Sequence, residues 1–185
     1  MAAKLLVLAG PPCSGKSSLA ESIQVRLEFH WLQVDQILSK LMPESSRNKN
    51  DRNVAYRAMH LSAENLLRCA SSVILDATYG SSEHRKAVEA LVVDLAVPLY
   101  LVECRVSPDT AVARFRARPN HPALDLSEQR VRDLANRYCY SGLGLTTTTE
   151  TPRLVALNHI EDYVRKTEPL CLDGSWSASA FGYSA

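Results

Sequence analysis

The sequence predicts an α/β fold in which helices flank a five-stranded parallel sheet. Short apolar runs alternate with longer segments whose apolar residues recur every three or four positions, a pattern typical of parallel strands joined by helical crossovers. The first apolar run also leads directly into a glycine-containing loop and then into a helical pattern. The 185 residues suffice for one well-buried domain. We expect this domain over residues 1–168, followed by a weakly ordered tail over residues 169–185 that buries little.

Apolar or β-branched runs mark the strands. A continuous apolar run suits a central parallel strand, because helices cover such a strand on both faces. The last run is rich in threonine, a β-branched residue that favours strands. The predicted strands are residues 4–9, 31–34, 72–75, 99–104 and 143–149.

Apolar spacing and capping residues mark the helices between these strands. After the glycine loop, Leu19, Ile23 and Leu27 recur every fourth residue, which predicts a helix with one buried stripe. Ser107 is a suitable N-cap, because a proline and an acidic residue follow it in the first turn. A helix is predicted from residue 36, and helix caps are predicted at Asp51 and at residues 80–82. The helix that begins after Ser107 is expected to end near Pro119, and the next helix to begin at Asp125 or Ser127. Asn158 and Glu161 are spaced like a capping box, which predicts the start of the last helix.

The glycine loop is the most specific motif in the chain. It reads Gly-Pro-Pro-Cys-Ser-Gly-Lys-Ser and matches the Walker A pattern Gly-x4-Gly-Lys-Ser/Thr, between a predicted strand and a predicted helix. In this setting Lys16 reaches the β- and γ-phosphates of a nucleotide, and the hydroxyl of Ser17 is a ligand of Mg²⁺. The motif therefore predicts a P-loop NTPase fold. The predicted nucleotide-binding residues are Gly10, Pro11, Pro12, Cys13, Ser14, Gly15, Lys16, Ser17 and Ser18.

Two aspartates follow predicted strands. The carboxyl ends of parallel strands form the ligand crevice of an open α/β sheet, so both side chains are expected near the glycine loop. Asp76 is predicted to bind Mg²⁺, and its alternative role is to cap the following loop. Asp35 is predicted to accept the proton of an attacking hydroxyl, and it could instead, or in addition, cap the helix that follows.

A basic segment follows the fourth predicted strand. Between Arg105 and Arg137 the sequence has seven arginines and four acidic residues. Arg114 and Arg118 are four residues apart and so share a helix face, which makes them the better pair to contact a transferring phosphate. We predict an arginine-bearing lid here, with solvated surface arginines as the alternative.

Composition excludes several other classes. A net charge of +1 gives no global reason to expect a nucleic-acid partner, and no apolar stretch approaches the roughly 18 residues of a membrane span. The five cysteines show no metal-ligand spacing, which indicates free thiols in a reducing cytoplasm. The segment Asn48-Lys49-Asn50-Asp51 resembles a guanine-reading motif, but it precedes Asp76 instead of following a late strand, so we interpret it as a loop and helix cap.

From residue 4 to about residue 166 the chain resembles the P-loop kinases that include chloramphenicol phosphotransferase, zeta-toxin-type kinases and polynucleotide kinases. The resemblance implies ATP- or GTP-dependent transfer of a phosphate to a hydroxyl group, with Mg²⁺, with Asp35 as the base and the arginine helix as a lid. It rests on the glycine loop, on residues 31–35 with Met42-Pro43 after them, on residues 73–78, and on residues 102–105 leading to Arg114 and Arg118.

One difference between this chain and the polynucleotide kinases predicts the kind of acceptor. Polynucleotide kinases often carry an arginine three residues after the base, where this chain has Leu38. A less charged small molecule, held among Trp31, Leu38 and Met42, is therefore favoured, and an antibiotic or a nucleoside-like compound would fit. Arg85 is a predicted contact for an anionic group of that substrate. A polynucleotide 5′-hydroxyl kinase and a nucleotide-dependent switch are the alternatives, and the oligomeric state stays open.

Overall fold

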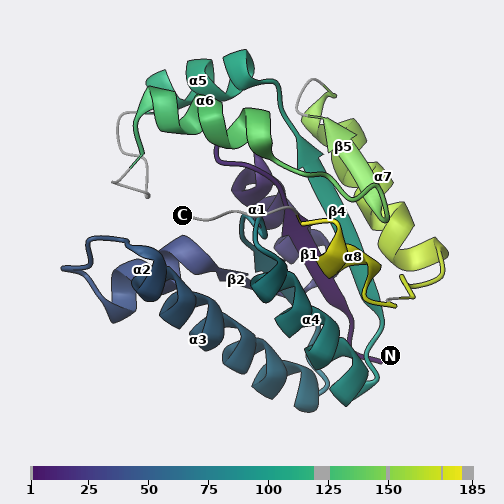
Figure 1. Cartoon of the computed structure of the whole chain (residues 1–185). Helices are drawn as coiled ribbons and strands as arrows, with labels where there is room; N and C mark the ends of the chain where they lie inside the picture. Colours follow the sequence, from purple (N-terminus) through teal and green to yellow (C-terminus); the bar gives the residue numbers. More distant parts are fainter. Residues whose placement is uncertain (1, 119–125, 149–150, 172, 181–185) are drawn as a thin grey trace.

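The chain forms a single parallel sheet with the predicted number of strands (Figure 1). The structure is a computed structural model that describes residues 2–118, 126–148, 151–171 and 173–180. The strands are β1 (Leu5–Ala9), β2 (His30–Gln33), β3 (Val73–Asp76), β4 (Leu99–Arg105) and β5 (Leu145–Thr148). Their order is β2-β3-β1-β4-β5, and all neighbouring pairs are parallel. The predicted α/β fold with a five-stranded parallel sheet is confirmed.

Helices cover both faces of this sheet. Within the described residues they are α1 (Lys16–Leu27), α2 (Val34–Leu41), α3 (Lys49–Arg68), α4 (Ser82–Leu95), α5 (Pro108–Arg116), α6 (Glu128–Arg137), α7 (Arg153–Lys166) and α8 (Ser175–Ala178). Leu6 and Leu8 of β1 pack with α1 and α7, whereas Leu5 and Val7 pack with α2, α3, α4 and α8. Because successive strand residues point to opposite faces, the continuous apolar run of β1 supplies both cores. None of the described helices is both long and apolar enough to cross a membrane.

Helix starts follow local capping chemistry where a serine is available. Ser81, Ser107 and Ser127 each accept a hydrogen bond from the backbone N–H three residues on, so these predicted caps are confirmed. For α3 the cap is Asn48, whose side chain accepts from the N–H of Asp51, and the prediction of Asp51 as the cap was wrong. Helix α5 ends at Arg116, near the predicted end at Pro119. The alternative start at Asp125, Pro119 itself and residue 149 of the last predicted strand lie outside the described residues.

The predicted capping box in the last long helix was also wrong. Helix α7 begins at Arg153, so Asn158 and Glu161 lie in its interior. Their three-residue spacing places both on one helix face, where the Nη1 atom of Arg26 on α1 donates to Asn158 at 2.9 Å and lies 3.4 Å from a carboxylate oxygen of Glu161. The spacing reflects a contact between two helices instead of a helix start.

The segment after residue 168 buries more than the sequence indicates. Trp176 on α8 is fully buried against α4, and the backbone N–H of Leu170 donates to the carbonyl of Leu99 at 2.8 Å. The N–H of Ser177 donates to Glu89 at 2.9 Å. The expectation that this segment buries little was therefore wrong, because the large side chain of Trp176 lies within the core. The domain boundary at residue 168 stays a prediction.

Helices α5 and α6 stand beyond the carboxyl end of the sheet and form the predicted lid (Figure 1). They pack on one another through a small separate cluster of Ala111, Val112, Val131 and Ala135. The lid begins after the end of β4, and the segment that follows α6 is hydrogen-bonded to the same strand. The carboxylate of Glu103, which is fully buried, accepts hydrogen bonds from the backbone N–H groups of residues 141 and 142 at 2.8 Å.

Candidate active site

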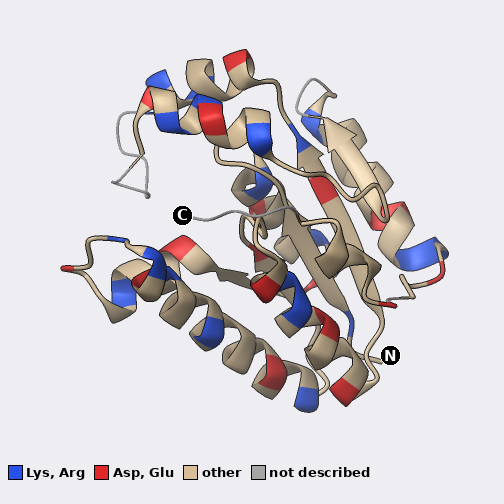
Figure 2. Ribbon diagram, in the orientation of Figure 1, with Lys and Arg blue, Asp and Glu red and all other residues tan. Residues whose placement is uncertain are grey.

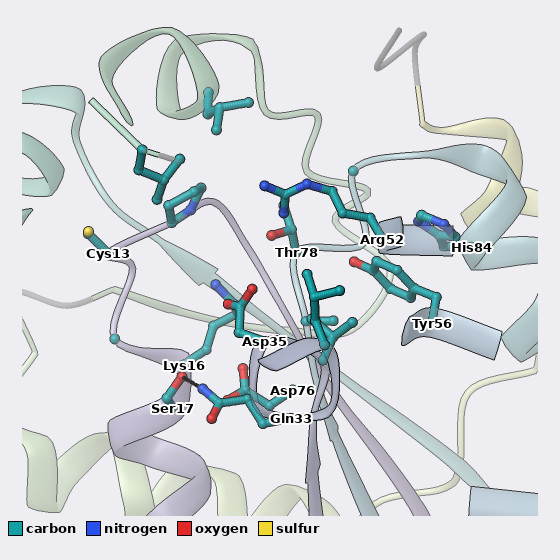
Figure 3. Close-up of a pocket in the computed structure, with 18 of the residues that line it drawn as sticks. Cys13, Lys16, Ser17, Gln33, Asp35, Arg52, Tyr56, Asp76, Thr78 and His84 are labelled. Carbon is teal, nitrogen blue, oxygen red and sulfur yellow. Dashed lines mark hydrogen bonds between the residues drawn. The ribbon is translucent and has the colours of Figure 1, made fainter. Parts of the chain in front are cut away.

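A cavity of about 1100 Å³ lies at the carboxyl ends of the strands, where open α/β sheets bind their ligands. The glycine loop after β1 forms its floor, and α5 and α6 contribute to one wall. The segment from α2 to α3 and the start of α4 form another wall. The cavity therefore brings together segments that are far apart in the sequence, and several of the predicted site residues line it (Figure 3).

The glycine loop wraps around the buried ammonium group of Lys16. Its Nζ donates to the carbonyl of Pro11 at 2.8 Å and lies 3.3 Å from the hydroxyl of Ser14. Cys13 and Gly15 have positive φ angles of 61° and 90°. Such alternation turns successive backbone N–H groups toward one concave side, which suits an anion. Burial raises the pKa of the Cys13 thiol, which agrees with the interpretation of this cysteine as a small loop residue.

Gly10 permits the loop to start against β4. Its φ angle is 150°, and a Cβ atom at this position would lie 2.5 Å from the carbonyl oxygen of Cys104. We expect Gly10→Ala to weaken nucleotide binding by at least about tenfold, since either the loop or β4 must shift. Isothermal titration with a non-hydrolysable ATP analogue measures this loss. Gly174→Ala is the matched control, because Gly174 also has a positive φ angle but no neighbour within 4 Å of its added Cβ. Equal affinities in both variants would contradict the expectation.

Asp76 and Ser17 meet at one end of the loop helix. Asp76 accepts a hydrogen bond from Ser17 and another from the indole N–H of Trp31 at 3.3 Å, and burial raises the pKa of its carboxyl group. Gln33, which pairs with Asp76 in the β2–β3 register, donates to the hydroxyl of Ser17 at 2.8 Å (Figure 3). Sequence analysis did not identify Gln33 as a site residue, because its position opposite Asp76 depends on strand register.

The oxygen atoms of Ser17 and Asp76 fit a magnesium ion. Both are hard donors, and their hydrogen bond shows that the two side chains converge on one point. No group of three or more His, Cys, Asp and Glu side chains within the described ranges could hold a metal ion. This donor set suits an ion that completes its shell with phosphate oxygens and water, as Mg²⁺ usually does. The assignment of Ser17 and Asp76 as magnesium ligands stays a prediction.

Asp35 lies in the first turn of α2 and lines the same cavity. The N-cap of α2 is Gln33, with no side-chain capping bond, so the alternative role of Asp35 as a helix cap was wrong. Its carboxylate is 28% exposed and has the Nη1 atom of Arg47 at 3.8 Å. The carboxylate thus faces the space in which a substrate would lie. Its role as a base stays a prediction.

Of the lid arginines at positions 114, 116 and 118, two line the cavity and one does not, as their spacing predicts. Arg114 and Arg118 both line the cavity, and Arg114 donates to the carbonyl of Cys13 at 3.3 Å. Arg118 lies two residues beyond the end of α5, so the pair spans the helix terminus. Arg116 points elsewhere and forms a two-fold hydrogen bond with Glu128 on α6 at 2.7 and 2.8 Å. Of these three arginines, Arg114 and Arg118 are therefore placed to contact a phosphate, and Arg130 on α6 also lines the cavity although it was not predicted.

The two remaining predicted substrate contacts are placed differently. Arg85 is fully buried and does not line the cavity. Its guanidinium donates to the carbonyls of Tyr79, Trp176 and Cys139 and to the hydroxyl of Ser179. The prediction of Arg85 as a substrate contact was wrong, because the fold itself uses its donors. Leu38 is 1% exposed and belongs to the core, although it reaches the cavity wall.

Several cavity residues were missed in the sequence. Arg47, Arg52, Tyr56 and His84 line the wall formed by α3 and α4. The rings of Tyr56 and His84 stack with centroids 3.6 Å apart, and burial lowers the pKa of His84 to about 4, so this imidazole is neutral at pH 7. Arg52 and Tyr56 are four residues apart on α3 and therefore share a face. That spacing was the available signal, but it does not indicate which face meets the glycine loop.

A comparison with family profiles identifies the chain. A profile described as an AAA domain matches residues 5–139, well over half of the chain. The chain belongs to the AAA domain family. The matched range begins with β1 and ends two residues after α6, so this AAA domain includes the glycine loop, both aspartates and the lid arginines. No curated protein matches the chain in sequence.

Solved structures with the same fold include kinases. A proposed kinase from Chloroflexus aurantiacus has a TM-score of 0.75 at 16% identity, with 88% of this chain and 99% of that chain covered. APS kinase from Mycobacterium tuberculosis, in complex with AMPPNP and APS, has a TM-score of 0.69 at 18% identity, with 89% and 98% covered. A chain of the Pnkp1/Rnl/Hen1 RNA repair complex has a TM-score of 0.60 at 18% identity, with 92% of this chain and 49% of that chain covered. At these identities the likeness shows that the AAA domain has a P-loop kinase fold.

The cavity of this AAA domain is strongly basic. Among the residues that line it are eight Lys and Arg and three Asp and Glu, although the whole chain has a net charge of only +1. Apart from Lys16 in the glycine loop and Arg153 on α7, the basic residues come from the lid and from the α2–α3 side of the domain, which face one another across the carboxyl end of the sheet (Figure 2). A cleft with this charge attracts anions and raises their local concentration.

Proposed function

We propose that this AAA domain transfers the γ-phosphate of ATP or GTP to a hydroxyl group of a small molecule. The observation that carries the proposal is the position of Asp35, a partly exposed carboxylate that lines the same cavity as Lys16, Ser17 and Asp76. A loop that only binds nucleotide does not need such a group. A phosphotransferase uses it to accept the proton of the attacking hydroxyl.

Each side chain has one task in the proposed reaction. Lys16 binds the β- and γ-phosphate oxygens, and Ser17 and Asp76 would hold Mg²⁺, which neutralises charge on those oxygens. The acceptor oxygen forms a bond to the γ-phosphorus as the bond to the leaving diphosphate breaks, and the acceptor proton passes to Asp35. Arg114 and Arg118 stabilise the charge on the transferring group from the lid side.

The comparisons support a kinase with a small acceptor. The two structural neighbours of highest TM-score given above are described as kinases, and this chain covers almost their whole length. The second is complexed with a nucleotide analogue and with APS, a small molecule. The resemblance to chloramphenicol phosphotransferase and zeta-toxin-type kinases supports the same reaction class, and an antibiotic or nucleoside-like acceptor stays within the proposal.

A polynucleotide 5′-hydroxyl kinase is the second candidate. The basic cavity favours it, since nucleic acids are polyanions, and one structural neighbour belongs to an RNA repair complex. The presence of Leu38 in place of an arginine three residues after Asp35 argues against it. The two candidates share the phosphoryl-transfer chemistry and differ in the acceptor.

An acceptor panel with labelled ATP and GTP tests the proposal. It includes antibiotics, nucleosides, sugars, hydroxy acids and 5′-hydroxyl oligonucleotides, with and without Mg²⁺. We expect Mg²⁺-dependent transfer to at least one small hydroxyl compound, and none by a Lys16→Ala variant. Transfer to oligonucleotides alone would select the second candidate. Nucleotide binding without transfer to any acceptor would contradict both.

A further inference from the structure

We propose that the acceptor carries an anionic group, a carboxylate or a phosphate, which binds a basic subsite formed by Arg47, Lys49 and Arg52. This inference rests on the proposed function and specifies its acceptor. All three residues line the cavity, and all three lie at or just before the start of α3. The subsite is separate from the glycine loop and from the arginines of the lid.

Arg47 gives the strongest indication of an anion-binding position. Its side chain is only 8% exposed, and its backbone is held in the left-handed region at φ 58°. Nη2 donates to the hydroxyl of Ser39 at 2.8 Å, but Nη1 has no hydrogen-bond partner among the described residues and lies 3.8 Å from Asp35. A buried guanidinium donor is costly to leave unpaired. The fold therefore holds a charged donor beside the predicted base, where an acceptor oxygen of a substrate would complete its bonding.

Arg52 extends the subsite into the open part of the cavity. Its Nε donates to the carbonyl of Arg47 at 2.9 Å, which fixes the two arginines relative to one another. The guanidinium then points into the cavity on the side of Thr78 (Figure 3). Each of the two guanidinium groups is planar and carries its donors in a fixed fork, which matches the geometry of carboxylate and phosphate groups.

The local charge balance favours an anion. Lys49 adds a third cation, and the N-terminal end of the 20-residue helix α3 adds the positive end of its dipole. Asp35 and Glu83 are the acidic residues of this wall, and Asp51 of the same helix turn accepts hydrogen bonds from Ser45 and Asn48 instead of facing the cavity.

The rest of the wall suits a compact acceptor. The stacked rings of Tyr56 and His84 lie beside Arg52 (Figure 3), and the imidazole is neutral at pH 7. An uncharged aromatic surface next to a cationic group accommodates a small carbon skeleton with one anionic end. Because Arg47 is buried, a group that enters the cavity fits this subsite better than a polynucleotide backbone that runs along the rim of the cavity. From the sequence, the anionic group of the acceptor was assigned to Arg85, and the proposal assigns it to Arg47, Lys49 and Arg52 instead.

Phosphate binding tests the subsite without knowledge of the acceptor. The protein is first saturated with AMPPNP and Mg²⁺, so that the glycine loop is filled, and is then titrated with inorganic phosphate by calorimetry. We expect Arg52→Gln to weaken phosphate binding by at least roughly tenfold, because a charge-assisted contact is lost. Arg57→Gln is the matched control, since Arg57 is exposed on the same helix and does not line the cavity. Arg52→Lys keeps the charge and is expected to lose less, and thermal unfolding of each variant verifies its fold.

Matched acceptors complete the test. Hydroxy acids are compared with their methyl esters, and sugar phosphates with the free sugars, so that the carboxylate and phosphate forms of the proposal are distinguished. We expect transfer to an anionic member with a KM at least tenfold below that of its neutral partner, and loss of this difference in Arg52→Gln. Equal use of both members by the unmodified protein and by Arg52→Gln would overturn the subsite while the kinase activity stands. Phosphate binding that depends on Arg52, without transfer to any acceptor, would support the subsite and overturn the proposed function. Transfer to oligonucleotides alone would overturn the small-acceptor form of the proposal.

Discussion

An Asp35→Asn variant is expected to transfer phosphate at least about 100-fold more slowly than the unmodified protein, with nearly unchanged nucleotide affinity. Asparagine has almost the shape of aspartate, but its amide cannot accept the proton of the attacking hydroxyl. Asp35 lies on the wall opposite the lid and makes no contact with the glycine loop among the described hydrogen bonds. Nucleotide binding and phosphate transfer should therefore separate in this variant.

The measurement uses the best acceptor from the panel, with kcat from labelled product and the nucleotide Kd from calorimetry. Glu44→Gln is the matched control, because it removes one carboxylate charge from the exposed connection between α2 and α3 without altering the cavity lining. We expect this control to keep its full rate. Turnover by Asp35→Asn equal to that of the control would show that Asp35 is not the base, and the acceptor hydroxyl would then need another proton acceptor.

Replacing Arg85 is expected to destabilise the fold strongly. Arg85→Met keeps most of the volume but leaves the buried carbonyls of Tyr79 and Trp176 and the partly buried carbonyl of Cys139 without their donor. Each buried acceptor without a partner costs about 1–3 kcal/mol, so we expect a total loss of about 4 kcal/mol in the free energy of unfolding. For a chain of this length the loss corresponds to a decrease of roughly 10 °C in Tm.

Denaturant unfolding and calorimetry measure this effect. Lys86→Met is the control, since Lys86 is the exposed neighbour of Arg85 on α4, and we expect its stability to change by less than about 0.5 kcal/mol. Below the melting temperature, nucleotide affinity should be the same in both variants, because Arg85 lies outside the cavity. If Arg85→Met were fully stable but bound its substrate poorly, Arg85 would be a substrate contact after all.

Local signals in the sequence predicted the sheet and one half of the site. The strands could be located because a buried parallel strand needs an uninterrupted apolar run, and the glycine loop because its geometry needs specific residues at fixed spacing. Asp76 was predicted as a site residue from its position directly after a predicted strand. Ser107 and Ser127 were recognisable as caps because capping involves only the first turn of one helix.

The misplaced or missed polar residues of the site share a physical cause. Three of the four partners of Arg85, namely Trp176, Ser179 and Cys139, lie more than 50 residues away in the chain. Arg47 and Gln33 likewise owe their positions to a turn and to a strand register that the spacing of residues does not encode. The sequence does not show whether a polar side chain faces a ligand or the protein core, so only the fold distinguishes Arg85 from Arg52.

Both ends of the lid connect to the chain beside β4, which allows the lid to differ between related proteins. Glu103 holds the segment after α6 beside the strand from which the lid departs, and the guanidinium of Arg105 lies over the ring of Tyr140 at 4.7 Å from its centre. The two ends of the lid are thus inserted at points that the sheet already keeps adjacent. Loop-closure entropy depends only weakly on the length of such an insertion. Helices of another length or charge could replace α5 and α6 while the sheet and the glycine loop stay as they are, so related chains can acquire new covers for the same phosphate site.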